Sequence, residues 1–154
     1  MNCCTYPSPL GRILLTEENE ALTGLYFEGQ RFYPSLPDDA EWRESPLLRQ
    51  AEDWLTAYFR GVDIPIDIPL APKGSAFRQA VWAKLLAIPY GAATTYGAIA
   101  AELHTSARAV GGAVGHNPIS ILIPCHRVLP ADGSVGGYAG GAERKEYLLR
   151  LEAK

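Results

Sequence analysis

Residues 124–128, Pro-Cys-His-Arg-Val, carry the most reactive group of side chains in this sequence. They follow the apolar residues 121–123, so the chain passes from an apolar run directly to a thiol, an imidazole and a guanidinium. Cysteine attacks mainly as its thiolate, and a free thiol has a pKa of about 8.5. A nucleophilic Cys125 therefore needs a basic or cationic neighbour, and His126 and Arg127 are both of that kind. The other interpretation is a buried structural thiol beside a surface histidine.

The other cysteines, Cys3 and Cys4, are adjacent, which is the wrong geometry for an ordinary disulfide. An odd number of cysteines predicts free thiols, a reducing compartment and a place in the cytoplasm. The histidines are His104, His116 and His126, so we predict no metal site at Cys3 and Cys4. Neither an apolar run of membrane-spanning length nor a signal-peptide pattern is present, so we expect no membrane partner.

The charge is distributed unevenly along the chain. The net charge is −3, but residues 1–72 hold 5 Lys/Arg against 12 Asp/Glu, and residues 73–154 hold 9 against 5. The first part is therefore acidic and the second basic. If the protein binds a phosphate backbone, the C-terminal half should make the contacts.

The elements that must position these groups begin with an N-terminal sheet and helix. Residues 10–27 contain two apolar runs around a polar stretch and predict a β-hairpin, and residues 34–44 are polar and predict a loop. Ser45 and Pro46 are typical of a helix start, and this helix should reach about Arg60. Its apolar residues recur at three- and four-residue spacing and predict a face packed on the sheet: Leu47, Leu48, Ala51, Trp54, Leu55, Tyr58 and Phe59.

Residues 64–69 alternate and contain two prolines, which predicts an edge strand leading into a linker at 71–74. The lobe boundary belongs there, with an N-terminal sheet-and-helix lobe at residues 1–70 and a second lobe at residues 74–154. We predict an α/β fold whose small N-terminal lobe precedes a mostly helical C-terminal lobe.

The C-terminal lobe begins with a helical pattern after Ser75 that ends near residue 89 and places five apolar residues on one face: Phe77, Val81, Trp82, Leu85 and Leu86. Thr94 or Thr95 can cap a short helix at 96–103, and Ser106 can cap another from 107 to about 114. Two short helices joined by a tight turn form a helix-turn-helix pattern, which alone is a weak signal. A last helix at 143–151 presents Tyr147, Leu148 and Leu151 on one side.

Three motifs together resemble the O6-alkylguanine-DNA alkyltransferases: residues 124–128, Asn117-Pro118, and Arg-Ala-Val-Gly-Gly at 108–112. The resemblance is strong over about residues 74–153, and over the first 70 it extends only to the plan of a small sheet with one helix. It implies that Cys125 accepts the alkyl group of O6-alkylguanine in DNA. A thioether offers water no activated carbonyl, so the protein would be spent after one transfer and would need no cofactor.

The resemblance also assigns the supporting catalytic residues. His126 would act through a bound water with Glu152 as its partner, and the Tyr96 hydroxyl would protonate the leaving purine. Asn117 would order the turn before the cysteine. Taken alone, Tyr96 fits an ordinary packed aromatic residue, and Asn117 fits a helix C-cap.

The helix at 107–114 would lie in the DNA minor groove, with Ala109, Gly111 and Gly112 among its DNA-binding residues. Arg108 would fill the place of the flipped-out nucleotide. Each glycine costs roughly 1 kcal/mol inside a helix, so both need a reason. That reason is either close approach to DNA or tight packing on a neighbouring helix, and Arg108 taken alone fits a solvated surface residue.

The substrate pocket implied by the resemblance contains Val128 together with Tyr138, Ala139 and Gly140 of the glycine-rich stretch 133–141. That stretch alone also fits a flexible hairpin loop. Ser120 stands where some members carry a pocket-lining proline, so the preferred alkyl size stays open, as does O4-alkylthymine. The implied partner is double-stranded DNA that contains O6-alkylguanine, bound by a monomer that is associated with the nucleoid while on DNA.

Three other functions share some of these features. Alkyltransferase-like proteins bind lesions on the same scaffold without a cysteine, and Cys125 argues against that function. A helix-turn-helix regulator would need a dimerisation or sensor element, and the sequence shows neither. A cysteine hydrolase would need turnover and an oxyanion site.

Overall fold

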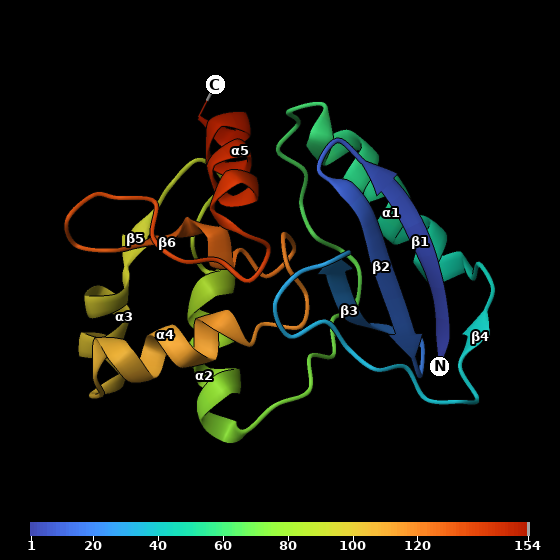
Figure 1. Cartoon of the computed structure of the whole chain (residues 1–154), viewed down its shortest axis with the longest axis horizontal. Coiled ribbons are helices and arrows are strands. Elements are labelled where there is room, and N and C mark those ends of the chain that lie inside the picture. The colour runs from blue at the N-terminus through green and yellow to red at the C-terminus, as the bar shows by residue number, and fades with distance from the viewer. Residues whose placement is uncertain (154) are drawn as a thin grey trace.

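The computed structural model describes residues 1–153 and contains two lobes side by side (Figure 1). The N-terminal lobe holds β1 (Asn2–Ser8), β2 (Gly11–Glu18), β3 (Ala21–Phe27), β4 (Glu41–Trp42) and α1 (Pro46–Phe59). The C-terminal lobe holds α2 (Ala76–Leu86), β5 (Thr94–Thr95), α3 (Tyr96–Leu103), α4 (Ala107–Gly115), the 3₁₀ helix η1 (Cys125–Arg127), β6 (Val128–Leu129) and α5 (Ala142–Glu152). The predicted fold class is confirmed.

The N-terminal sheet has the strand order β3-β2-β1-β4, and α1 packs across β1, β2 and β3. β1 pairs with β2 and β2 with β3 in antiparallel register, whereas β4 runs parallel to the start of β1. The β2–β3 pair is the predicted hairpin, and Asn19 and Glu20 in its turn have positive φ values of 52° and 60°. The sequence analysis did not predict β1 and assigned the residues of β4 to a loop.

The helix α1 begins and ends as predicted. The Ser45 side chain accepts a hydrogen bond from Leu48 N, and Gly61 follows the last turn with a φ of 83°. The stripe that faces the sheet is buried at Leu48, Ala51, Leu55 and Tyr58, and its other members are partly buried.

The predicted edge strand at residues 64–69 is wrong. This stretch is extended but irregular, and only the next residue, Leu70, forms a β-bridge, with Leu22. Leu22 N donates to Pro69 O at 2.8 Å, and Ala71 N donates to Leu22 O at 2.8 Å. Because proline has no N–H, residues 65 and 69 cannot donate to a sheet ladder, and pairing begins only beyond them.

The helices of the C-terminal lobe start at the predicted caps. The side chains of Ser75, Thr95 and Ser106 each accept a hydrogen bond from the backbone N–H three residues further on, which fixes the starts of α2, α3 and α4. Three of the five predicted core residues of α2 are buried, but Phe77 and Leu86 are exposed. In α5 the buried residues are Lys145, Leu148 and Glu152, so the prediction that Tyr147 belongs to the inner face is wrong.

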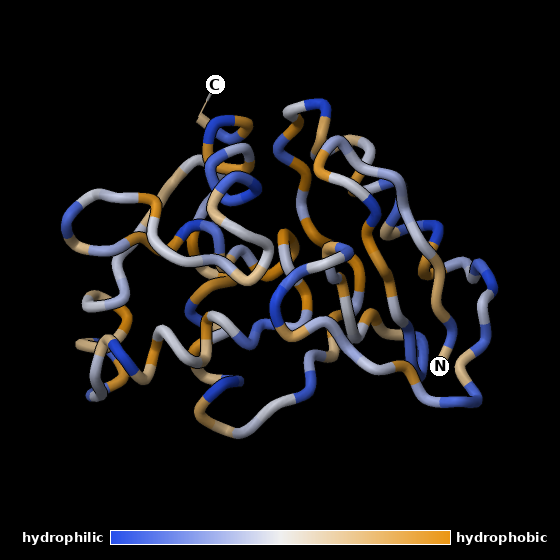
Figure 2. The backbone as a smooth tube through the Cα atoms, viewed as in Figure 1, coloured by the Kyte–Doolittle hydropathy of each residue, from blue (hydrophilic) through white to orange (hydrophobic). Residues whose placement is uncertain are grey.

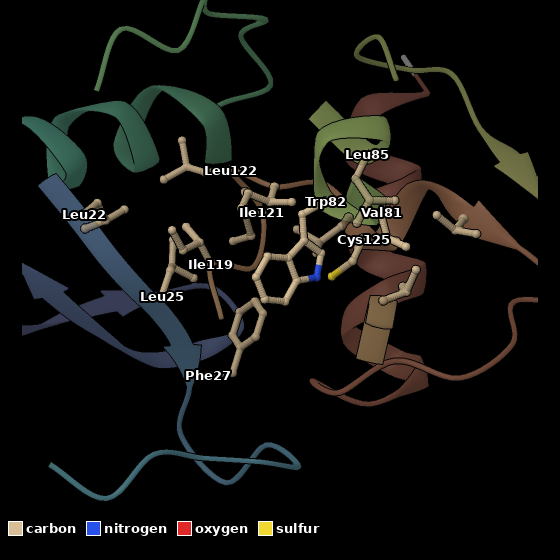
Figure 3. Close-up of a cluster of buried hydrophobic side chains, with 14 of the residues drawn as sticks. Leu22, Leu25, Phe27, Val81, Trp82, Leu85, Ile119, Ile121, Leu122 and Cys125 are labelled. Atoms are coloured by element: carbon tan, nitrogen blue, oxygen red, sulfur yellow. The ribbon is translucent and has the colours of Figure 1, made fainter. Parts of the chain in front are cut away.

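The two lobes share one hydrophobic core. Figure 2 shows apolar segments concentrated where the lobes meet, and Figure 3 shows Leu25 and Phe27 of the sheet lobe close to Trp82 and Cys125 of the helical lobe. The backbone also crosses the boundary: Leu25 N donates to Pro118 O at 2.8 Å, and Ser120 N donates to Leu25 O at 3.1 Å. The N-terminal sheet therefore supports the segment that leads to the cysteine.

Candidate active site

Asn117 organises the turn that delivers Cys125. Its side chain is 3% exposed, its Nδ2 donates to Ile123 O at 2.7 Å, and its Oδ1 accepts from Ile119 N at 3.0 Å. These bonds fold the apolar residues 119–123 into a compact turn between α4 and η1. Cys125 begins η1, so the reactive segment is a 3₁₀ turn with the thiol and the imidazole on consecutive residues.

The residues after the turn stay inside the protein. Cys125 is 3% exposed and His126 is 0% exposed, so the alternative with a surface histidine is wrong. His126 Nε2 lies 2.6 Å from Glu152 Oε2. An ionised carboxylate can only accept, so Nε2 carries the proton and Nδ1 keeps the free lone pair of the neutral ring. Nδ1 is buried and has no hydrogen bond to any described residue.

Glu152 gathers donors from several elements. Arg127 donates to it from Nε at 2.7 Å and from Nη2 at 3.1 Å, and the Tyr58 hydroxyl donates to Oε2. Burial raises the pKa of Glu152, but hydrogen bonds from His126 and Arg127 outweigh it and lower the pKa to about 2. Burial lowers the pKa of His126 despite this carboxylate. The pair is therefore a neutral imidazole beside an ionised glutamate at neutral pH.

The cation that acts on the Cys125 thiol is Lys145. Burial raises the pKa of the thiol, and Asn117, the Lys145 ammonium and Ser120 oppose that rise. Arg127 instead points its guanidinium at Glu152 and Ile88 O, so the sequence analysis named the wrong cation as the neighbour of the thiol.

Lys145 is completely buried and donates to Val128 O at 2.7 Å and Gly137 O at 3.1 Å. Burial lowers its pKa to about 8. The sequence analysis did not identify Lys145 as a site residue. It lies seven positions before Glu152, about two helical turns, so a buried Glu152 places Lys145 on the same inner face.

A cavity of about 280 Å³ is lined by residues of α3, α4, the segment 31–32 and the glycine-rich stretch, and Cys125 is not among its lining residues. Its lining includes four of the residues predicted for the site: Tyr96, Gly111, Tyr138 and Ala139. Burial, and after it the charge of Cys125, raises the pKa of both Tyr96 and Tyr138. Two predicted pocket residues, Val128 and Gly140, do not line the cavity.

The wall of the cavity is attached to the N-terminal lobe. Arg31 N donates to Ala139 O at 2.9 Å, and Arg144 donates to Leu10 O, Gly140 O and Glu28 O. Arg31 and Phe32 also line the cavity, and the sequence analysis identified neither as a site residue. The glycine-rich stretch is therefore held in place by hydrogen bonds rather than being a free loop.

The helix α4 presents its small residues outward. Arg108 and Gly112 are exposed, and Ala109 and Gly111 are half-buried. A Cβ atom at Gly112 would meet no atom of the described chain within 4 Å, and one at Gly111 would only touch Tyr96 at 3.9 Å. Tight packing inside the protein therefore does not explain either glycine.

Other features of the described residues bear on the site less directly. Cys3, Cys4 and Cys125 are all free thiols. Residues 1–153 contain no group of three His, Cys, Asp or Glu side chains placed to hold a metal ion. No helix in this part of the chain has the length and apolar character needed to cross a bilayer.

Comparison with known proteins places both lobes in one family. Residues 1–72 match the family described as 6-O-methylguanine DNA methyltransferase, ribonuclease-like domain, and residues 76–154 match 6-O-methylguanine DNA methyltransferase, DNA binding domain. A methylated-DNA--protein-cysteine methyltransferase of Haemophilus influenzae is 44% identical over 150 residues, covering 96% of this chain and 83% of that protein. Its namesake in Methanosarcina acetivorans is 43% identical, covering 96% and 95%.

A solved structure has the same architecture. The crystal structure of Mycobacterium tuberculosis OGT in complex with DNA superposes with a TM-score of 0.89 at 40% identity. The match covers 99% of this chain and 93% of that one.

Proposed function

The chain belongs to the 6-O-methylguanine DNA methyltransferase family, and on that premise we propose that it repairs DNA by moving the alkyl group of O6-alkylguanine onto Cys125. The observation that carries the proposal is a buried Cys125 thiol that adjoins the His126–Glu152 pair and is under the positive charge of Lys145, in a lobe whose cavity has Tyr96 in its wall. The partner in this proposal is double-stranded DNA, and the Mycobacterium tuberculosis relative has a crystal structure in complex with DNA.

The bond-making step needs a thiolate. His126 Nδ1 takes the thiol proton through a water, and the imidazolium that forms is stabilised by Glu152. The Cys125 sulfur then attacks the alkyl carbon, a C–S bond forms, the C–O6 bond breaks, and its electron pair stays on the purine. The Tyr96 hydroxyl gives the leaving purine a proton. The thioether is not hydrolysed, so each molecule acts once and needs no cofactor.

The guanine must leave the duplex before a buried thiol can reach its O6 atom. In this proposal α3 and α4 form the DNA-binding unit, α4 enters the minor groove, and Arg108 occupies the place of the extruded nucleotide. The cavity receives the flipped base, with Tyr138 and Ala139 in its wall, whereas Val128 and Gly140 do not line it. This placement of α4 is supported by Gly111 and Gly112, because no tight packing inside the described chain requires a glycine at either position.

Intact mass measured after incubation with an O6-methylguanine oligonucleotide tests the function. We expect each molecule to gain one CH₂ unit and then to react no further, and peptide mapping should place the methyl group on Cys125. Burial and the Glu52 carboxylate raise the pKa of Cys4 to about 12, so that thiol should stay unmodified. Cys125→Ala should bind DNA without gaining mass. A label on Cys3 or Cys4, or more methyl groups than protein molecules, would refute the proposal.

A further inference from the structure

Tyr58 brings the N-terminal lobe into contact with the residues that surround Cys125. It lies in the last turn of α1, is 1% exposed, and donates a hydrogen bond to Glu152 Oε2 across the lobe boundary. The two residues are 94 positions apart in the sequence. The sequence analysis counted Tyr58 only as part of the apolar stripe of its helix.

Tyr58 shares its acceptor atom with the imidazole. Glu152 Oε2 also takes the bond from His126 Nε2 at 2.6 Å and one from Arg127 Nη2 at 3.1 Å. Each donor disperses part of the negative charge of a carboxylate and so weakens its attraction for the remaining protons. Tyr58 therefore competes with His126 for the charge on one oxygen. Its hydroxyl stays protonated, because burial and then the Glu152 charge raise its pKa.

Several other polar groups surround this carboxylate. From the segment after α2, Gly91 N donates weakly to Oε1 at 3.4 Å, and the Tyr90 ring packs edge-on to Tyr58 at 6.3 Å between centroids. The charges of Arg127 and Lys145 add to the effect of burial in lowering the pKa of His126. Burial, and after it the charges of Glu152 and Asp63, raises the pKa of Tyr90. The Tyr90 hydroxyl is buried and bonds to no described residue, so it offers a matched control for Tyr58.

We propose that Tyr58 is a positioning residue for the alkyl transfer, and that its hydroxyl holds Glu152 toward His126 and limits the pull of the carboxylate on the imidazole proton. The inference rests on the proposed function, because Tyr58 acts on the reaction only through Glu152. The N-terminal lobe thereby helps to set the pH range in which His126 accepts the thiol proton.

The direction of the effect follows from the charge. Replacing the Tyr58 hydroxyl by hydrogen concentrates negative charge on Oε2, which favours the imidazolium and raises the pKa of His126. Neutral His126 is the form that takes the thiol proton, so transfer is lost as the pH falls through the pKa of His126. Tyr58→Phe should therefore move the acid limb of the rate profile to higher pH.

The test is the pH dependence of single-turnover methyl transfer from an O6-methylguanine oligonucleotide for the parent, Tyr58→Phe and Tyr90→Phe. We expect the midpoint of the acid limb to move to higher pH by about half a unit or more in Tyr58→Phe. A shift of this size corresponds to less than the usual energy of a hydrogen bond to a charged group. Tyr90→Phe should keep the limb of the parent. A loss of packing or stability alone would lower the rate at every pH and leave the limb in place.

An unshifted limb in Tyr58→Phe, or equal shifts in the two tyrosine variants, would overturn the inference. A second comparison sets Glu152→Gln against the double variant that also carries Tyr58→Phe. The two should have the same acid limb, because the amide of Gln has no negative charge for the Tyr58 hydroxyl to disperse. A shift that persists there would mean that Tyr58 acts by another route. A parent that transfers no methyl group would overturn the proposed function as well, whereas a reactive parent with an unmoved Tyr58→Phe limb overturns this inference alone.

Discussion

Burial disfavours the charged form of each ionisable side chain around Cys125. Burial raises the pKa of the thiol, lowers that of His126, and lowers that of Lys145 to about 8. Moving the thiol proton to His126 creates two opposite charges at once, between Lys145 on one side and Glu152 on the other. The charged pair is therefore stabilised as a unit, and removing one member should affect the whole of it.

At the residue scale we predict that His126→Ala and Glu152→Ala each slow methyl transfer at least about tenfold, the lower side of the usual cost of losing a general base. The reason is that the thiolate forms only together with an imidazolium that Glu152 stabilises. Single-turnover rates at saturating DNA measure the effect. Parent-like rates in both variants between about pH 6 and about pH 9 would rule out the assignment.

The lowered pKa of Glu152 also determines how the stability of the protein should respond to acid. Its pKa is lowered from 4.5 to about 2 in the folded protein, so its contribution is present above the unfolded pKa and is lost as the pH falls through the folded one. Between about pH 6 and about pH 3 the parent should lose about 2 kcal/mol more free energy of unfolding than Glu152→Gln. Chemical denaturation at the two pH values measures this, and parallel losses would contradict the prediction.

At the scale of elements, local signals predicted the helices well. The hydroxyl caps at Ser45, Ser75, Thr95 and Ser106 fix where α1, α2, α3 and α4 begin, and each cap is a short-range hydrogen bond that a sequence can reveal. Strands were harder to predict, because pairing depends on distant partners. β1 contains Pro7 and several polar residues, and only its position beside β2 makes it a strand.

The site could be predicted in part for the same reason. The motif residues Cys125 and His126 are adjacent in the sequence, whereas Lys145 can be deduced only from the periodicity of α5, which places it on the same face as Glu152. Arg31, Phe32 and Tyr58 come from the other lobe, so no local pattern connects them with the thiol. They depend on how the lobes pack, which the sequence analysis could not supply.

Replacing a glycine of α4 by alanine should change stability and DNA binding in opposite directions. Gly112→Ala should raise the free energy of unfolding by up to about 1 kcal/mol, because alanine is the better helix former and its Cβ meets nothing in the described chain. The same methyl group should weaken DNA binding if α4 approaches the minor groove closely. Denaturation and a DNA titration at fixed salt give the two values. Unchanged affinity would mean that the DNA contacts another part of the surface.

Arg108, at the exposed start of α4, should matter for extruding the nucleotide and not for the bond-making step. Extrusion costs a few kcal/mol, and each 1.36 kcal/mol left uncompensated is about tenfold in rate. Arg108→Ala should therefore react much more slowly with duplex DNA, less so with a single-stranded lesion, and almost normally with the free base. Single-turnover rates on the three substrates measure this order. Equal losses on all three would assign Arg108 to the fold or the pocket.

At the scale of the whole molecule, the lobes are joined too extensively to behave as separate units. The core is continuous between them (Figure 3). Leu25 exchanges backbone hydrogen bonds with residues 118 and 120, and Arg144 ties α5 to two segments of the sheet lobe. The division of the chain into lobes at residues 1–70 and 74–154 remains a prediction. The shared core argues that neither part keeps its full stability when the other unfolds.

This predicts one cooperative unfolding transition, which the tryptophans can test. Trp54 lies in α1 and reports on the N-terminal lobe, whereas Trp82 lies in α2 within the core that the two lobes share, and the exposed Trp42 can be replaced by Phe in both reporters. Adding Trp82→Phe leaves Trp54 as the only indole, and adding Trp54→Phe leaves Trp82. Within each variant, denaturant curves followed by tryptophan fluorescence and by far-ultraviolet circular dichroism should coincide, because losing either lobe exposes the apolar face of the other.

If the Trp54 signal changes at lower denaturant than the overall secondary structure, the N-terminal lobe unfolds first. In that case the bond from Tyr58 to Glu152 would be lost before the alkyl-acceptor lobe unfolds.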